Sequence, residues 1–407
     1  MRKPSSIPQI TIVVPGRWHA FDLAGELEQL GALHRIVTTY PRSRTRHWNI
    51  PDAKVVCLPL SLLLTKLVWK LGGERLAMRQ QYRINDLFAR RAAQKLGSPD
   101  VVHAWSGSAE PSLVAARRRG IAAVVERSSA HMLEQCRILR EEFAGLGLRW
   151  EETPRAVVER ELREYELADR VFVPSLFVER SFHSRGFSPE NLFRNGFGVD
   201  LSRFRPGKKK DDVFRIIYAG SLSVRKGVHY LVRAFKEANI PNSELLLVGS
   251  MLPETDKLIG LADQRIRRLG HVPQAQLPTI YHSGSVFAMA SVEEGQALVQ
   301  AQALGCGLPL VCTTNTGGED FLAMSGDAKP LRGGVVEFPA GCVVRAGDSI
   351  GLAEAFCLLA SNPARLSEMR SAATALAKRD LSWRRYARGN LMHYSALIEG
   401  RSRQIHR

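Results

Sequence analysis

The feature that most constrains the fold is an alternation of short, apolar, β-branched runs with longer segments of helical spacing. Near-continuous apolar strands separated by amphipathic helices predict a parallel sheet that helices cover on both faces. Strands are predicted at 10–14, 35–40, 54–58, 101–104, 121–126, 170–174, 214–219, 244–248, 286–290 and 309–313. Helices are predicted at 21–30, 75–96, 111–118, 154–167, 228–238, 274–282 and 296–304. The predicted fold class is therefore α/β, with two doubly wound units in tandem.

A segment rich in glycine and charge, residues 195–212, interrupts this alternation and is typical of a linker. We therefore predict a first domain at 1–195, a linker at 196–212 and a second domain at 213–383. Ligands of doubly wound sheets bind at the carboxyl ends of the strands. Two such units therefore predict a ligand-binding cleft between the domains.

The chain carries 57 lysines and arginines against 40 aspartates and glutamates, a net charge of +17. This excess points to a polyanionic partner such as nucleic acid, an anionic membrane or a phosphorylated substrate, and a generally basic surface is the alternative. The sequence contains no recognised nucleic-acid module, so nucleic acid is not expected as a partner. Six scattered cysteines without a C-x-x-C pair favour a cytoplasmic protein with neither a disulfide framework nor a metal site.

One apolar stretch, residues 55–69, raises the question of a membrane contact. Pro59 and Lys66 interrupt it and Lys70 follows, so a spanning helix is not expected. An apolar surface beside basic side chains suits the anionic inner face of a membrane, which makes peripheral attachment one interpretation. The other is a buried strand followed by a helix on the domain surface. The sequence leaves both open.

Residues 290–312 follow the pattern strand, acidic loop, helix with a terminal glycine, strand. Glu294 and Gly295 fall where the helix is expected to begin, and a helix N-terminus offers backbone N–H groups and positive charge to a phosphate. Gln302 follows Glu294 by eight residues, about 12 Å along a helix, so the two could address separate parts of one extended ligand. Ordinary N-terminal helix chemistry is the alternative for Glu294 alone.

Two adjacent cations, Arg225 and Lys226, lie between a predicted strand and a predicted helix. Arg binds phosphate through parallel hydrogen bonds and Lys acts as a point charge, so the pair is suited to a phosphorylated ligand. A solvated pair on a loop is the alternative.

Several segments, in this order along the chain, resemble motifs of the retaining GT-B glycosyltransferases of group 1, the GT4 type. They are 168–175 and 198–204 (end of the first domain and linker), 218–235 (G-x-L-x-x-x-K-G), 268–281 (loop beside the nucleobase) and 290–312 (E-x7-E region). The resemblance implies the GT-B fold, in which two Rossmann-like domains face a cleft. It also implies a last helix, at about 384–407, that crosses back to the first domain.

The resemblance further implies that a nucleotide-sugar donor binds to the second domain. Glu294 would bind hydroxyls of the donor sugar, residues 295–298 would lie near the phosphates and residues 270–272 beside the base. The expected donor-binding residues are Gly16, Gly220, Arg225, Lys226, Gly249, Gly270, His271, Val272, Gly295, Gln296, Ala297, Leu298 and Gln302.

The expected catalytic residues are Glu294 and His103. Residues 100–105 resemble the family's strand that ends in an active-site histidine, and either His103 or the position of Trp105 aligns with it. A structural histidine is the alternative for His103. The expected acceptor-side residues, Arg127, Ser128 and His131, follow another strand, and helix capping by Ser128 or Ser129 is the alternative there.

The sequence departs from the family at two positions. Gln302 stands where the second acid of E-x7-E is expected, which removes charge assistance from the ribose contact. Ser221 stands where an arginine is frequent, and Arg225 is expected to supply that cation. Preorganised cations and backbone donors can stabilise a departing pyrophosphate, so neither a metal nor another cofactor is expected.

The predicted function is that of a retaining glycosyltransferase. It would transfer a hexose from a nucleotide sugar to a glycan or lipid-linked glycan in cell-surface polysaccharide synthesis. The alternatives are a catalytically silent GT-B binding or scaffold protein, and a nucleotide-sugar epimerase or hydrolase of the same fold.

Overall fold

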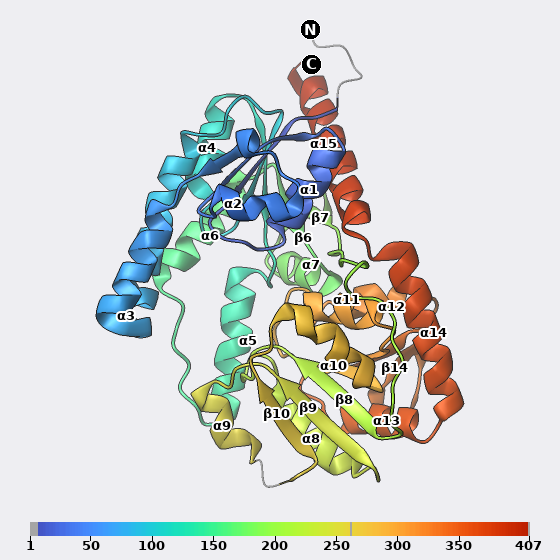
Figure 1. The fold of residues 1–407 in the computed structure, drawn as a ribbon. Coiled ribbons are helices and arrows are strands. Elements are labelled where there is room, and N and C mark those ends of the chain that lie inside the picture. The colour runs from blue at the N-terminus through green and yellow to red at the C-terminus, as the bar shows by residue number, and fades with distance from the viewer. Residues whose placement is uncertain (1–6, 261–262, 406–407) are drawn as a thin grey trace.

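The computed structural model describes residues 7–260 and 263–405, which form two α/β domains, one above the other in Figure 1. The first sheet has the spatial order β3 (Val55–Cys57), β2 (Leu33–Thr38), β1 (Ile10–Val14), β4 (Val101–Trp105), β5 (Ala122–Glu126), β6 (Arg170–Val173), β7 (Leu192–Arg194). The second has the order β10 (Ile266–Gly270), β9 (Ser243–Val248), β8 (Phe214–Ala219), β11 (Val286–Met289), β12 (Leu310–Thr313), β15 (Gly341–Val344), β14 (Val336–Phe338), β13 (Lys329–Pro330). Apart from the antiparallel pairs of β14, the neighbouring strands are parallel. The predicted pair of doubly wound units is confirmed.

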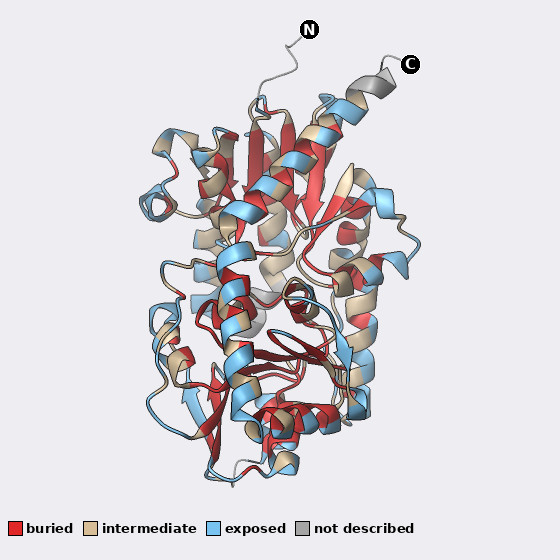
Figure 2. Ribbon diagram, turned by 90° about the vertical axis from the view of Figure 1, so that its right-hand side faces the viewer, coloured by how far each residue is buried: buried red, intermediate tan, exposed pale blue. Residues whose placement is uncertain are grey.

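Helices cover the sheets, whose central strands are buried, whereas β10 and β13 are largely exposed (Figure 2). One face of the first sheet packs against α1 (Ala20–Gln29) and α15 (Trp383–Ile405). The other packs against α3 (Leu60–Ala93), α4 (Glu110–Arg118), α6 (Arg155–Leu167) and α7 (Leu176–His183). The first domain also contains α2 (Arg42–Thr45) and α5 (Met132–Gly145). The second contains α8 (Val228–Ala238), α9 (Pro253–Ile259), α10 (Leu277–Ser283), α11 (Leu298–Gly305), α12 (Gly318–Ala323), α13 (Ser349–Ala360) and α14 (Pro363–Asp380).

The last helix, α15, leaves the second domain after α14 and runs along the first (Figure 1). Tyr386 and Tyr394 are buried in the first domain's core, and Arg401 pairs with Asp169 at 2.6 Å. The helix therefore completes the first domain; residues 406–407 of its predicted range lie outside the described residues.

The linker and the start of α15 lie side by side, so the chain crosses between the domains twice at one place. The backbone N–H of Val199 donates to the carbonyl of Leu381 at 2.7 Å. A Cβ added at Gly198 would lie 2.5 Å from the backbone nitrogen of Trp383. A glycine is needed there because the two crossings touch.

Three helix starts differ from the prediction by two residues or more. α10 begins at Leu277 rather than at residue 274, because residues 274–276 form a 3-10 turn. α3 begins at Leu60 rather than at residue 75, because residues 60–71 have helical spacing in a run too apolar for periodicity to identify. The helix is interrupted at Gly73, whose φ of 69° and ψ of −172° are not helical, so the predicted start falls just after this break. α11 begins at Leu298 rather than at Gln296, with Ala297 in extended conformation before it. Glu294 and Gly295 therefore lie in a loop before the helix, and the expected 12 Å helical spacing between Glu294 and Gln302 does not apply.

Candidate active site

The carboxyl ends of the two sheets face each other, and the loops that follow β5 and β11 touch there (Figure 1). The carboxylate of Glu293 accepts the backbone N–H of Ala130 at 3.0 Å. The Ser175 hydroxyl donates to the carbonyl of Gly295 at 2.6 Å. The predicted donor loop therefore forms part of the contact between the domains.

Gly295 is in the tightest part of this contact. A Cβ added to it would overlap the carbonyl oxygen of Ser128 and approach Ser129. The position therefore requires glycine for close approach of two backbones rather than for a positive φ.

The side chains of Lys226 and Glu294 form an ion pair at the carboxyl end of the second sheet. The Lys226 side chain comes from the loop between β8 and α8, and Glu294 from the loop after β11. Burial, with the neighbouring charge of Arg225, lowers the pKa of the Lys226 ammonium to about 7. The structure thus brings together a predicted phosphate-binding cation and the predicted sugar-binding carboxylate.

Arg225 has a different environment from the one expected. Its Nε donates to the Glu293 carboxylate at 2.7 Å, and its Nη2 donates to the Ser129 hydroxyl at 3.2 Å. Glu293 is fully buried and was not singled out in the sequence. Arg225 therefore bridges the two domains, and its role as a phosphate-binding cation stays a prediction.

The loop from Gly295 to Leu298 is fixed by the side chain of Gln296. Its Oε1 accepts the backbone N–H of Phe197 in the linker at 2.6 Å, and its Nε2 donates to the carbonyl of Gly317 at 3.2 Å. Both polar atoms of the Gln296 side chain are thus bonded to the protein. A donor at this loop would therefore bind to backbone N–H groups rather than to the Gln296 side chain.

Three of the predicted glycines lie at the ends of neighbouring strands. A Cβ at Gly249 would overlap the carbonyl of Gly220, and the N–H of Gly249 donates to the carbonyl of Gly270 at 2.8 Å. These glycines let the ends of β8, β9 and β10 come close together, and His271 and Val272 follow directly.

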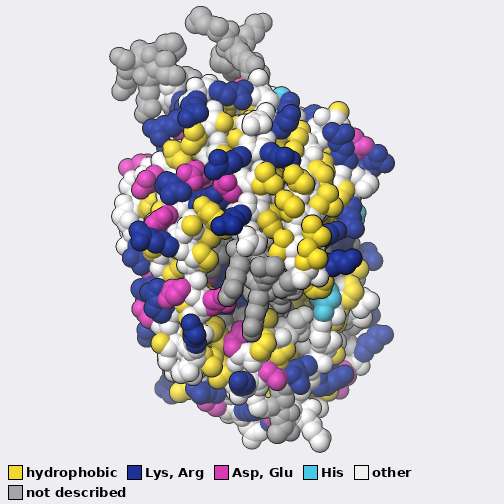
Figure 3. Space-filling model, turned by 90° about the vertical axis from the view of Figure 1, so that its left-hand side faces the viewer, with side chains coloured by type: hydrophobic (Ala, Val, Ile, Leu, Met, Phe, Trp, Pro, Cys, Tyr) yellow, Lys and Arg dark blue, Asp and Glu magenta, His cyan; other side chains and the backbone are white. Residues whose placement is uncertain are grey.

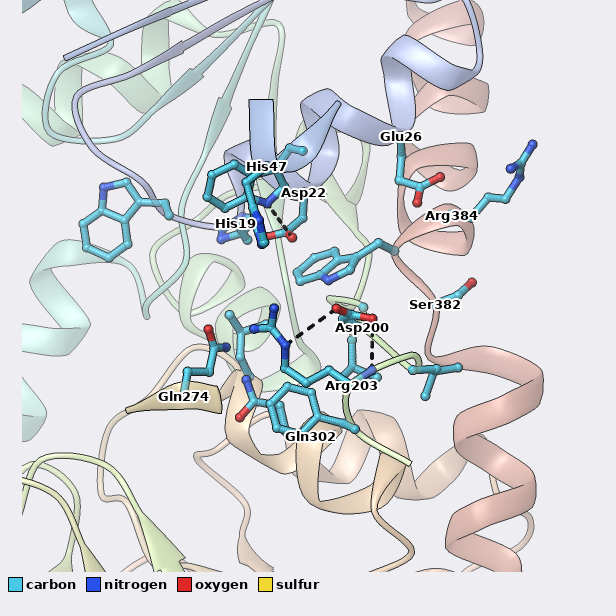
Figure 4. A pocket seen from close by; sticks show the side chains of 18 of the residues that line it. His19, Asp22, Glu26, His47, Asp200, Arg203, Gln274, Gln302, Ser382 and Arg384 are labelled. Atoms are coloured by element: carbon cyan, nitrogen blue, oxygen red, sulfur yellow. Dashed lines mark hydrogen bonds and ion pairs between the residues drawn. The ribbon is translucent and has the colours of Figure 1, made fainter. Parts of the chain in front are cut away.

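Both domains line a pocket of about 560 Å³ (Figure 4). Leu298 and Gln302 line it from the predicted donor set. Arg17 faces them from the first domain and donates from Nη2 to Gln274 Oε1 at 3.4 Å. The other lining residues are Trp18, His19, Asp22, Glu26, His47, Trp48, Gly198, Val199, Asp200, Leu201, Arg203, Phe204, Ser382, Trp383 and Arg384. Aromatic faces with a few carboxylates and guanidinium groups suit a base, a ribose or a sugar.

The loop after β1 forms the upper wall of this pocket. Gly16 precedes Trp18, whose φ of 31° is unusual for a residue with a side chain. The Trp48 indole donates to Asp22 at 3.1 Å (Figure 4). His19, Asp22, Trp48 and Trp383 were missed in the sequence; for His19 the available signal was its place just after the first strand.

The predicted catalytic histidine, His103, is fully buried, does not line the pocket and bonds to Tyr394 of α15. Its Nε2 lies 3.0 Å from the carboxylate of Glu126, which also approaches His19 Nε2 at 2.5 Å. Burial by itself raises the pKa of Glu126, but the two histidines outweigh it and lower that pKa to about 2. The structural alternative accounts for the contacts of His103, and it is His19 that reaches the pocket.

The predicted acceptor-side residues are mostly engaged within the first domain. Arg127 pairs with Glu161 at 2.8 Å, and Ser128 packs on Gly295 through its carbonyl. His131 caps α5, where its Nδ1 accepts the N–H of Leu133 at 3.3 Å. The alternative of capping by Ser128 or Ser129 is therefore wrong, because the helix begins three residues later.

Burial and the charge of Arg127 lower the pKa of His131 to about 4. As the pH falls below 6.5 the unfolded chain takes up a proton that the folded chain refuses until about 4, so this window destabilises the fold. Between pH 6.5 and about 4 the wild type therefore loses up to about 3 kcal/mol of unfolding free energy through His131. We expect His131→Asn, which retains a capping side chain but does not titrate, to remove this loss. Urea unfolding of both proteins at the two ends of the window measures it. An equal difference in unfolding free energy at both ends would contradict the assignment.

In the described part of the chain, no three His, Cys, Asp or Glu side chains are grouped to hold a metal ion.

Comparison with known proteins agrees with this geometry. Residues 213–362 match the family described as Glycosyl transferases group 1. D-inositol 3-phosphate glycosyltransferase 1 of Catenulispora acidiphila is 26% identical over 331 residues, which cover 75% of this chain and 74% of the relative. The GDP-mannose-dependent monoacylated alpha-(1-6)-phosphatidylinositol monomannoside mannosyltransferase of Corynebacterium glutamicum is 25% identical over 232 residues, 51% of this chain and 57% of the relative.

Solved structures share the fold at low identity. Anabaena HepE in complex with UDP and glucose has a TM-score of 0.65 and 16% identity, covering 96% of this chain and 100% of that one. Sucrose-phosphate synthase from Thermosynechococcus elongatus has a TM-score of 0.66 and 17% identity, covering 97% of this chain and 100% of that one.

Two facing Rossmann-like domains define the fold as GT-B, the fold of the solved structures that the chain resembles. The second domain matches the group 1 glycosyltransferases over residues 213–362, and the resemblance predicted from the sequence is confirmed for that part of the chain. Such enzymes use nucleotide-sugar donors.

Proposed function

We propose that this protein is a retaining, metal-independent hexosyltransferase that acts in the cytoplasm. Its donor is a nucleotide sugar and its acceptor a glycan or lipid-linked glycan in cell-surface polysaccharide synthesis. The observation that carries the proposal is the Lys226–Glu294 pair at the carboxyl end of the second sheet. The pair does not line the pocket between the domains, which Leu298 and Gln302 of the same donor region line.

Each partner of this pair has a distinct task. The Lys226 ammonium stabilises the negative charge that grows on the pyrophosphate as the glycosidic bond breaks. The Glu294 carboxylate accepts hydrogen bonds from hydroxyls of the donor sugar. In the free protein the two neutralise each other, so the donor exchanges one ion pair for two ligand contacts.

The configuration of the anomeric carbon is retained because the acceptor oxygen attacks it from the same face from which the nucleoside diphosphate departs. The bond from the anomeric carbon to the phosphate oxygen breaks, and its electron pair leaves with the nucleoside diphosphate. The acceptor oxygen bonds to the same carbon, and its proton passes to the departing phosphate. No protein nucleophile is needed.

The acceptor class rests on the relatives. The corynebacterial relative is described as acting on a phosphatidylinositol mannoside, and the first-domain wall of the pocket carries tryptophans and carboxylates, which suit a sugar. A lipid-linked glycan is therefore the proposed acceptor.

The reaction is tested by incubating the protein with α-linked nucleotide sugars and candidate lipid-linked glycans. We expect nucleoside diphosphate release that depends on the acceptor, and an α-linked product by NMR. A β-linked product would exclude retention. Release without acceptor would indicate the hydrolase, and donor binding without turnover would indicate the silent protein that Gln302 and Ser221 suggest.

Metal independence is a separate prediction. Because Lys226 and backbone N–H groups supply the positive charge beside the pyrophosphate, we expect EDTA to leave the rate of transfer unchanged. The measurement is the initial rate after extensive dialysis against EDTA. A rate that is lost and then restored by Mg²⁺ or Mn²⁺ would contradict the prediction.

A further inference from the structure

The first turns of α3 expose an unusual amount of apolar surface. Leu63, Leu67 and Leu71 are 57%, 51% and 76% exposed and recur every four residues, which places them on one stripe of the helix. Trp69 is 61% exposed. Four of the eleven large hydrophobic side chains that are exposed in the described part of the chain thus lie within nine residues.

The charge of this segment is entirely positive. Lys66 and Lys70 are exposed and lie one turn apart, and no acidic residue occurs between Leu60 and Leu71. Seen from the side on which α3 lies, the molecule has a large hydrophobic area bordered by Lys and Arg side chains (Figure 3). Leucines and a tryptophan beside lysines are the composition of helices that lie in a membrane interface.

The position of the helix leaves this surface accessible. α3 forms the left-hand edge of the molecule in Figure 1. Its later turns, through Phe88 and Ala92, hold it to the first sheet. No helix among the described residues is long and apolar enough to cross a bilayer.

We propose that residues 60–71 dock the protein on an anionic lipid surface, with the leucine stripe inserted at the interface and Lys66 and Lys70, which flank the stripe, on the lipid phosphates. This deepens the proposed function, because it brings the cleft to a lipid-linked acceptor. Charge complementarity selects the anionic surface, since the segment carries two cations and no acid.

Vesicle flotation of the full chain tests this directly. We expect flotation with vesicles of phosphatidylcholine and phosphatidylglycerol at low salt, weaker flotation at high salt and little with phosphatidylcholine alone. The double variant Leu67→Gln/Leu71→Gln should lower the bound fraction at least about tenfold, because the apolar insertion is lost. Lys66→Gln/Lys70→Gln should lower it on anionic vesicles and remove its salt dependence.

The matched control is Ile350→Gln/Met392→Gln, which removes two equally exposed apolar side chains from α13 and α15. We expect it to float like the wild type. Donor binding, followed by nucleotide-induced thermal shift without vesicles, should be unchanged in every variant, so a failure of docking is distinguishable from a failure of the proposed activity.

Three results would overturn the proposal. The first is a wild-type protein that does not float, and the second is a Leu67→Gln/Leu71→Gln variant that floats as well as the control. The third is that light scattering shows a dimer for the wild type and a monomer for Leu67→Gln/Leu71→Gln, since a second copy of the chain would then cover the stripe.

Discussion

Replacing Lys226 with alanine is expected to lower kcat/KM for the nucleotide-sugar donor by about 10²–10³-fold, the usual loss when a preorganised group that stabilises developing charge is removed. The Lys226 ammonium pairs with Glu294 within the second domain. Arg225, in contrast, is held by Glu293 and takes part in the contact between the domains. The variant also leaves Glu294 without its partner. Steady-state kinetics with saturating acceptor measure the effect.

The pH dependence of nucleoside diphosphate binding distinguishes the charge of the Lys226 side chain from its packing. Because burial lowers the pKa of Lys226 to about 7, the protonated form is lost as the pH rises through that value, and nucleoside diphosphate binding should weaken with it. Lys226→Arg keeps its charge at every accessible pH and should remove this dependence. Calorimetric titration between about pH 6 and about pH 9 measures both proteins. Binding to Lys226→Ala as tight as to the wild type would show that the ammonium does not contact the phosphates.

Replacing Gly295 with alanine is expected to lower kcat/KM by at least about 10²-fold, because a small misplacement of reacting groups has that cost. The added methyl group would overlap the carbonyl of Ser128, so the loop or the whole domain has to move. The neighbouring bond from Ser175 to the carbonyl of Gly295 would then lengthen or break. Kinetics and small-angle scattering of the free protein measure the loss and the separation of the domains.

A helical glycine provides the control for this variant. Gly145 is the last residue of α5, and nothing lies within 4 Å of a Cβ added there. Gly145→Ala should therefore leave both kcat/KM and the scattering profile as they are in the wild type. Normal activity of Gly295→Ala would contradict the close contact between the donor loop and the first domain.

The strands at the centre of each sheet could be predicted well because they are buried on both faces, whereas β7, β10, β13, β14 and β15 were not predicted. β1 and β8 occupy the residues expected, since a strand covered by helices has to be apolar almost throughout. Helix starts were harder. The apolar run before Gly73 fits a helix or a strand equally, and the loop before α11 is held out of the helix by bonds from Gln296 to Phe197 and Gly317.

The site could be predicted only where its residues follow a local motif. Lys226 and Glu294 belong to such motifs and meet in the structure. Glu293 could not be predicted, because its role depends on Ala130, which lies 163 residues away in the chain. The Glu126 cluster likewise joins residues of the first loop, two strands and the last helix, and only the fold brings them together.

Nucleotide-induced stabilisation tests the central claim, that the cleft binds a nucleotide-sugar donor through Lys226. Thermal unfolding is followed with UDP-, GDP- and ADP-linked hexoses, each at about 1 mM, the upper end of usual KM values. One of them should stabilise the wild type by about 2.7 kcal/mol at a hundred times its Kd, a shift of several degrees in Tm, and should stabilise Lys226→Ala much less. No shift in the wild type with any of the three, or an equal shift in both proteins, would contradict the claim.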